Sequence, residues 1–265
     1  MNNSIKAMTK AFIPDTGVEV PPTQDELPYD DGEPMETERH KLQMDLLIDA
    51  LQPWLDERPD GYVGGNMFVY YSMNQVRNKD FKGPDFFVVL DVPKGERKSW
   101  VVWQEDKAPD VVIELLSEST AAQDKNEKKL IYQDKMRVGE YFWYDPFNPD
   151  DWAGFRLVNQ VYQPIATNER NQLASQALQL VLTQWEGNYK GVNTVWLRWA
   201  TLEGELLPTG QELERRRAED ERRRAQAAES ALQRTIRNLI AQNMSLEQVA
   251  QITGLSQTEV EQLRN

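Results

Sequence analysis

Apolar residues along the chain change between a helical and an extended period. Residues 36–55 place apolar side chains every three or four positions, which predicts an amphipathic helix of about five turns. Short β-branched and aromatic runs then predict strands at 61–72, 81–92, 99–103, 111–116 and 140–144. Between the last two runs, residues 122–136 return to helical spacing. This order of elements predicts an α/β fold with a mixed sheet flanked by helices.

The pattern continues past this core. Residues 154–158 and 160–165 predict a small hairpin, and 173–185 and 192–200 alternate in the manner of strands. We expect these segments to extend the edge of the same domain. Residues 201–210 follow as a linker.

Paired glycines, Gly64-Gly65, interrupt the strand predicted at 61–72. Such a pair could cradle a phosphate, but the segment lacks the lysine and the following helix of a phosphate-binding loop. The favoured interpretation is a bulge in the strand.

The composition changes at residue 211, where Glu, Arg, Ala and Gln dominate as far as residue 243. Acidic residues are followed four positions later by arginines, and this order, acid first, is the favourable one on a helix. In addition, small and large apolar residues repeat every seven positions, at Ala218, Ala225, Leu232 and Leu239. The pattern predicts a charged, solvated helix that could form a coiled coil. A basic DNA-binding helix is the alternative, and the interspersed acids argue against it.

The last segment, 244–265, has the spacing of a helix-turn-helix motif. Ala250 would let two helices approach, Gly254 would make the turn, and Val260 would pack the second helix. That second helix offers Glu259 and Glu261 against a single arginine, so it is a poor surface for phosphates. A protein-packing or oligomer-contact role is favoured over DNA binding. At the other end, residues 1–34 are rich in Pro, Asp and Glu, which predicts a flexible arm.

Composition restricts the chemistry. The chain has no cysteine and a single histidine, His40, so thiolate sites and multi-histidine metal sites are excluded within one chain. His40 begins the first predicted helix, and solvation or helix packing is the expected role rather than catalysis. Carboxylates and lysines must carry any chemistry, and carboxylates favour Mg²⁺ or Mn²⁺.

The net charge of -13 argues against a protein that coats nucleic acid and leaves room only for local DNA contacts. No apolar run reaches the roughly 20 residues that span a bilayer, and the first residues lack a signal-peptide core. No membrane association is expected, and the predicted location is cytoplasmic.

A carboxylate stands inside the most apolar predicted strand. Glu114 lies among Val, Ile and Leu residues, where an unpaired charge is costly. Asp85 opens another predicted strand, and lysines follow in the segment 122–136. If the two strands are neighbours, the acids could share a divalent ion for phosphodiester hydrolysis. The alternative is that Glu114 is simply paired with a lysine or arginine in the core.

Three segments carry a resemblance to a known family: GPDFFVV, PDVVIELLSEST and EKKLIYQDKMRVGEYFWYDP. Through them, residues 35–200 resemble the bacterial Uma-type putative restriction endonucleases, within the PD-(D/E)xK nuclease superfamily. The resemblance implies a restriction-endonuclease-like mixed sheet and places the metal-binding acids on Asp85 and Glu114.

The catalytic lysine of that superfamily usually lies two residues after the second acid, where this chain has Leu116. The resemblance instead places it on the following helix, with Lys128 the best match and Lys129 the fallback. It also includes Ser117 and Asp124, which are expected to cap or support rather than bind metal.

The sequence therefore predicts a Mg²⁺- or Mn²⁺-dependent DNA endonuclease. We expect a homo-oligomer, a dimer formed through the nuclease domain or the C-terminal helix. The alternative is a catalytically weak or inactive nuclease-like scaffold that acts through its C-terminal helices in protein interaction or DNA-linked regulation.

Overall fold

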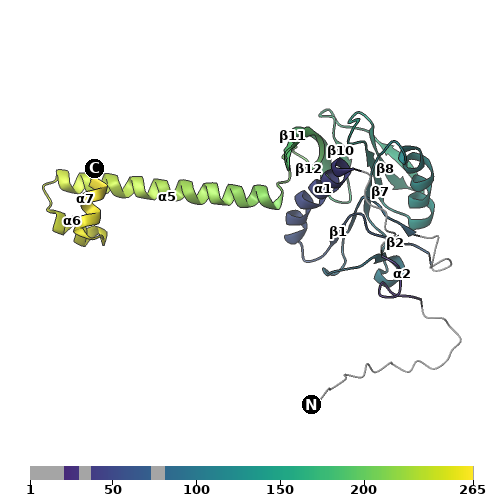
Figure 1. Cartoon of the computed structure of the whole chain (residues 1–265), viewed down its shortest axis with the longest axis horizontal. Helices are drawn as coiled ribbons and strands as arrows, with labels where there is room; N and C mark the ends of the chain where they lie inside the picture. Colours follow the sequence, from purple (N-terminus) through teal and green to yellow (C-terminus); the bar gives the residue numbers. More distant parts are fainter. Residues whose placement is uncertain (1–20, 30–36, 73–80, 265) are drawn as a thin grey trace, which may run out of the picture. The chain divides into compact units, whose positions relative to one another are not determined.

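The computed structural model describes residues 21–29, 37–72 and 81–264 of the chain (Figure 1). They form two compact units, Met1–Leu207 and Pro208–Asn265. Most of the arm predicted at 1–34 lies outside the described residues. Within 21–29, Leu27 is buried against Phe68 and Tyr70, so this part of the segment is packed.

A six-stranded mixed sheet is the centre of the first unit. In spatial order its strands are β1 (Tyr62–Gly64), β4 (Phe86–Val89), β6 (Val111–Leu115), β7 (Glu140–Tyr144), β8 (Trp152–Val158) and β9 (Val161–Ile165). The pair β6–β7 is parallel and the other neighbours are antiparallel. The predicted α/β class with a mixed sheet is confirmed.

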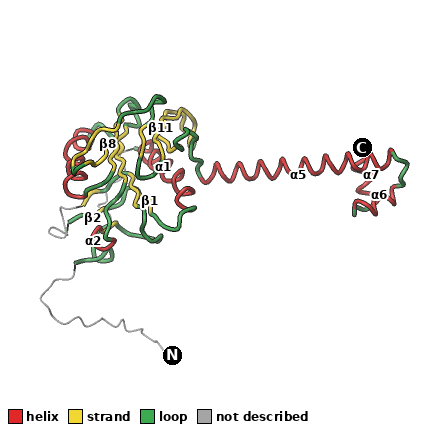
Figure 2. The backbone as a smooth tube through the Cα atoms, turned by 180° about the vertical axis from the view of Figure 1, so that it is seen from behind, coloured by secondary structure: helices red, strands yellow, loops and turns green. Residues whose placement is uncertain are grey.

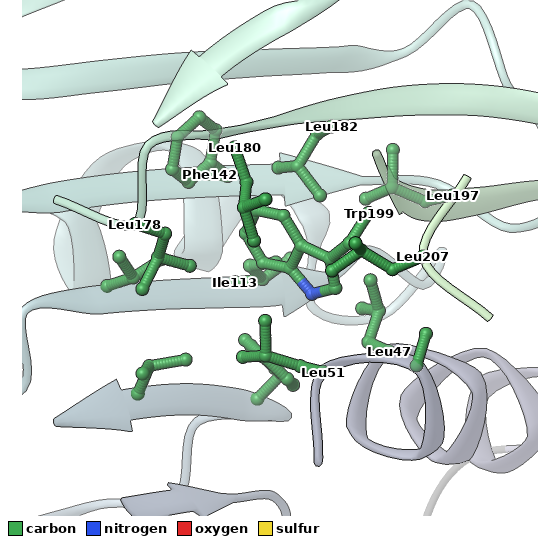
Figure 3. Close-up of a cluster of buried hydrophobic side chains, with 14 of the residues drawn as sticks. Leu47, Leu51, Ile113, Phe142, Leu178, Leu180, Leu182, Leu197, Trp199 and Leu207 are labelled. Carbon is green, nitrogen blue, oxygen red and sulfur yellow. The ribbon is translucent and has the colours of Figure 1, made fainter. Parts of the chain in front are cut away.

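One face of this sheet carries the larger hydrophobic core. Helix α1 (Glu38–Asp56) packs there together with a second, three-stranded sheet of β10 (Leu173–Ser175), β11 (Leu180–Tyr189) and β12 (Val192–Ala200). Figure 3 shows leucines from α1 and from the second sheet surrounding Trp199 and Ile113. The expected edge addition is thus a sheet of its own, because its apolar face is buried over the core rather than paired with a free edge.

The opposite face is covered by one continuous helical segment. It consists of α3 (Ala121–Gln123), η2 (Asp124–Lys128), α4 (Lys129–Ile131) and η3 (Tyr132–Met136), with π-helical geometry in η2 and η3. Figures 1 and 2 show α1 and this segment on opposite sides of the sheet. The helix predicted at 122–136 is confirmed, and its buried residues pack on the aromatic face that includes Tyr141 and Phe87.

Two of the predicted strands are wrong as single strands, because part of each lies in a small third sheet. It contains β3 (Phe81–Lys82), β2 (Val69–Tyr70) and β5 (Trp100–Val101), followed by the single helical turn α2 (Val102–Glu105). The segments 61–72 and 81–92 each divide between this sheet and the central one. The breaks fall at Gly64-Gly65 and at Gly83-Pro84, where glycine allows a sharp change of direction and proline cannot continue a ladder. Likewise, the strand predicted at 99–103 ends after two residues.

Gly65 is a position where a side chain would disturb the site described below. A Cβ atom there would lie 2.5 Å from the Asp85 carbonyl oxygen and 2.8 Å from Met44 Sδ. We expect Gly65→Ala to lower the free energy of unfolding by about 1–3 kcal/mol through overpacking. Urea unfolding would measure this. Gly95→Ala is the matched control, since a Cβ at Gly95 meets nothing within 4 Å, and an equal loss in both variants would contradict the prediction.

The second unit is a helical extension. A long helix, α5 (Gly210–Ala241), is followed by α6 (Leu246–Thr253) and α7 (Gln257–Arg264). Thr209 and Ser245 begin α5 and α6 with capping boxes, and Gly254 ends α6 in the left-handed region at φ 73°. Two short helices joined by a turn at Gly254 therefore lie within the segment 244–265, and the helix-turn-helix motif itself stays a prediction.

The apolar residues of α5 pack within their own unit. Leu232 and Leu239, the large members of the predicted heptad, contact a cluster built on Ile236, Val249 and Val260. The remaining heptad members, Ala218 and Ala225, are exposed. In a coiled coil, contacts with a second helix would therefore be made by alanines at these heptad positions, and the coiled coil stays a prediction. In neither unit is a described helix long and apolar enough to cross a membrane.

Candidate active site

Asp85 immediately precedes β4, and Glu114 lies on the adjacent strand β6. Antiparallel pairing of β4 and β6 sets Phe86 opposite Ile113, so the chain enters β4 at Asp85 beside the end of β6 that carries Glu114. The Asp85 carboxylate also accepts a hydrogen bond of 2.7 Å from the backbone N–H of Leu115. Glu114 faces the helical segment through Tyr132 and Lys128, and Asp85 adds to the negative charge around that lysine.

Glu114 is completely buried and is held by two partners. Its Oε1 accepts a 2.6 Å hydrogen bond from the Tyr132 hydroxyl, and its Oε2 lies 3.2 Å from Lys128 Nζ. Burial raises the pKa of Glu114; Lys128 and the Tyr132 hydrogen bond lower it, and nearby Asp124 raises it further. The buried carboxylate thus depends on its neighbours to remain ionised.

Lys128 connects the acids. Besides Glu114, its Nζ contacts Asp124 Oδ1 at 2.7 Å. Burial alone would lower the pKa of Lys128, but Glu114, Asp124 and Asp85 together outweigh burial and raise it. With only protein groups around it, Lys128 is held as an ammonium ion.

Asp124 was expected to cap or support rather than bind metal. The helical segment begins before it, at Ala121, so it is not the cap, and its side chain is 1% exposed and contacts Lys128. Asp124 Oδ2 has no hydrogen-bond partner among the described residues. One signal was available: Asp124, Lys128 and Tyr132 are spaced four apart, which places them on one helical face.

The other predicted residues lie nearby but point elsewhere. Ser117 Oγ accepts a hydrogen bond from the Thr120 N–H, where the helical segment begins. Lys129 turns away, with its Nζ 3.4 Å from the centre of the Phe155 ring, and burial lowers its pKa. Leu116, at the usual lysine position, is buried. The structure thus brings Lys128 rather than Lys129 to the acids.

The group fits a divalent cation in charge and in donor chemistry. Three carboxylates influence the single ammonium of Lys128, which leaves an excess of negative charge when all are ionised. One buried carboxylate oxygen, on Asp124, lacks a partner within the described part of the chain. Carboxylate oxygens are the donors that Mg²⁺ and Mn²⁺ prefer. No three acids or histidines converge into a ready-made metal cage among the described residues, so Lys128 and the acids would have to readjust around an ion.

Removing one hydroxyl tests the support of Glu114. We expect Tyr132→Phe to lower the free energy of unfolding by about 1–3 kcal/mol, because a buried carboxyl oxygen loses its hydrogen-bond donor. Urea denaturation near neutral pH would measure the loss. Tyr62→Phe is the control, because among the described residues its hydroxyl donates a hydrogen bond only to the Met67 sulfur, at 3.5 Å. A loss no larger than in this control would contradict the assigned role of Tyr132.

Comparison with known proteins identifies relatives of the chain. The family model Uma2, described as "Putative restriction endonuclease", matches residues 17–186. Among solved structures, the crystal structure of a putative nuclease belonging to DUF820 from Anabaena variabilis ATCC 29413 is similar. It shares 16% sequence identity, covers 60% of this chain and 91% of that chain, and superposes with a TM-score of 0.41. No curated protein sequence matches the chain significantly.

Proposed function

The chain belongs to the Uma2 family of putative restriction endonucleases, and from this we propose that it is a divalent-metal-dependent DNA endonuclease that hydrolyses phosphodiester bonds. The observation that carries the proposal is the position of Asp85 at the start of β4, hydrogen-bonded to the Leu115 N–H next to Glu114, with Lys128 contacting Glu114. Hydrolysis of a phosphodiester requires charge neutralisation at phosphate and a positioned water, and this group contains residues for both.

Asp85 and Glu114 would hold the ion, with Asp124 as an additional carboxylate at the same group. When bound, Mg²⁺ or Mn²⁺ supplies positive charge at the scissile phosphate and acidifies a water molecule. Lys128 presents an ammonium that can donate hydrogen bonds to that water or to a phosphate oxygen. Tyr132 keeps the Glu114 carboxylate oriented, and the buried setting strengthens each of these interactions.

The charge distribution supports a cation requirement for DNA binding. The second unit, 208–265, contains nine acidic residues and nine arginines, so the net charge of -13 lies in residues 1–207. Phosphates approaching an acidic site are repelled until a cation neutralises it. DNA affinity is therefore expected to depend on the divalent ion.

A cleavage assay tests the proposal. The full-length chain would be incubated with supercoiled plasmid, linear duplex and single-stranded DNA in Mg²⁺, in Mn²⁺ and in EDTA. We expect cleavage in either metal and none in EDTA. Cleavage that is unaffected by EDTA, or no cleavage of any substrate in either metal, would contradict the proposal.

A second function is favoured by the separate C-terminal unit. Residues 208–265 have their own hydrophobic cluster, and Ile252 on α6 is 59% exposed. In this alternative the chain is a nuclease-like scaffold that assembles through these helices. Light scattering would then show a larger mass for the full chain than expected for one copy, and removal of residues after Gly210 would return it to a monomer. An unchanged assembly state would contradict this alternative.

A further inference from the structure

A cavity of about 680 Å³ lies just beyond the ends of β6 and β7. It is formed where three segments meet: the beginning of α1, the chain after β6 and the chain after β7. Its lining includes His40, Ser117, Glu118, Asp145, Phe147 and Asn148. Crevices at the carboxyl ends of parallel strands are common ligand sites in α/β sheets, and this volume is typical of small-ligand pockets.

The cavity is close to the acids in the chain. Leu116 and Ser117 follow Glu114 by two and three residues, a distance of about 7–10 Å along an extended chain. This separation is close to that between neighbouring nucleotides. A nucleotide with its phosphate at the acids could thus place an adjacent base in the cavity.

Aromatic rings form one wall. His40 is buried, and its Nε2 donates to the Leu116 carbonyl at 2.9 Å, since a carbonyl can only accept. Its Nδ1 lies 2.8 Å from the Thr37 hydroxyl, so both ring nitrogens are engaged and the ring is fixed. Of the two expected roles of His40, solvation or packing, the structure shows packing. Phe147 is 56% exposed, and the centre of its ring lies 5.7 Å from the centre of the His40 ring. The Arg39 guanidinium lies 4.4 Å from the centre of the Phe147 ring.

The polar groups of the cavity favour a base over a phosphate. Glu118 and Asp145 would repel an anion, whereas carboxylates accept hydrogen bonds from the amino groups of bases. Asp145 Oδ1 accepts from the backbone N–H groups of Phe147 and Asn148, which fixes the loop that carries the exposed ring. No described residue hydrogen-bonds the Asn148 side-chain amide, so it remains available to a base edge.

We propose that this cavity binds an unpaired nucleobase next to the scissile phosphate, with Phe147 as the stacking surface. The proposal rests on the proposed nuclease function and adds a substrate class: DNA with an unstacked base, as in single strands, flaps or frayed ends. A base within a duplex cannot enter such a pocket unless it leaves the stack. An exposed aromatic ring beside an arginine is the usual platform for single-stranded nucleic acid.

The single histidine of the chain gives a direct test. Ring signals of His40 would be followed by NMR while deoxyadenosine, and separately inorganic phosphate, is added to the full-length protein without metal. We expect saturable shifts with deoxyadenosine and none with phosphate. Phe147→Ala should weaken deoxyadenosine binding at least about fivefold, the lower end for loss of one base–aromatic stack. Phe147→Trp should retain it.

Tyr29→Ala is the matched control, because Tyr29 is an exposed aromatic residue, 62% accessible, that does not line the cavity. Equal binding by Phe147→Ala and the wild type, or shifts caused by phosphate, would overturn the proposal. This readout needs neither metal nor cleavage. Loss of nucleoside binding in Phe147→Ala would therefore support the pocket even if no cleavage were found, and metal-dependent cleavage without nucleoside binding would reject the pocket alone.

Discussion

Asp85→Asn is expected to lower the rate of metal-dependent DNA cleavage by about a thousandfold while leaving the fold intact. A carboxylate that holds a divalent ion contributes several kcal/mol to catalysis, and each 1.36 kcal/mol is a factor of ten in rate. The substitution removes one charge but keeps an oxygen that can accept the Leu115 N–H. Glu114→Gln should have a similar effect on rate, with some loss of stability because its amide would face the Lys128 ammonium.

Single-turnover cleavage in Mg²⁺ and in Mn²⁺ would measure these rates. The matched control is Asp91→Asn, which alters an exposed acid just beyond the far end of β4. Circular dichroism and urea unfolding would establish that each variant is folded. A folded Asp85→Asn protein that retains more than about a tenth of the wild-type rate would be incompatible with the proposed site.

Lys128→Met is expected to lower the free energy of unfolding by about 3–5 kcal/mol in the absence of divalent ions. Removal of one partner from a buried ion pair leaves an uncompensated charge, and here the ammonium serves both Glu114 and Asp124. Lys129→Met is the natural control, since the neighbouring lysine contacts an aromatic ring instead of the acids. Urea unfolding in EDTA would compare the two.

The size of this loss should depend on pH. Burial raises the pKa of Glu114, so its protonated form is favoured in the folded protein and is reached at a higher pH than for an ordinary glutamate. Below that pKa the uncompensated charge disappears, and above it the penalty is complete. The Lys128→Met defect should therefore be larger at about pH 8 than at about pH 5.

Divalent ions should reduce the stability loss of Lys128→Met, and most at the pH where that loss is largest. Mg²⁺ or Mn²⁺ would replace the missing positive charge, so each should restore stability to Lys128→Met more at about pH 8 than at about pH 5. A defect that is independent of pH and unaffected by either ion would show that Lys128 does not neutralise these carboxylates.

Local patterns were sufficient for several elements. Apolar spacing predicted α1 and the helical segment 121–136, because a face buried against a sheet requires a repeat of three to four residues. The run of Val, Ile and Leu around Glu114 predicted β6, which is buried along its whole length. Glu114 itself was recognisable as a site residue, since an acid in such a run needs a compensating partner.

Other features had no local signal. The sequence did not show that β4 and β6 are neighbours, because pairing depends on contacts between segments more than 20 residues apart. It did not show that the strands at 61–72 and 81–92 divide between two sheets, because glycine permits a turn without specifying where the chain goes next. It also left the lysine open between Lys128 and Lys129, whose side chains diverge once the helical segment is docked.

The sequence by itself determined the types of element, the absence of cysteine chemistry and the acids with a lysine that any hydrolytic site must use. Tertiary structure decided which of them meet. Pairing of β4 with β6 brought Asp85 to the Leu115 N–H, next to Glu114. Docking of the helical segment buried Asp124 and directed Lys128 to Glu114 and Asp124. The physical reason is that secondary structure follows from contacts within a few residues, whereas the charge balance of a buried site depends on distances that only the packed chain fixes.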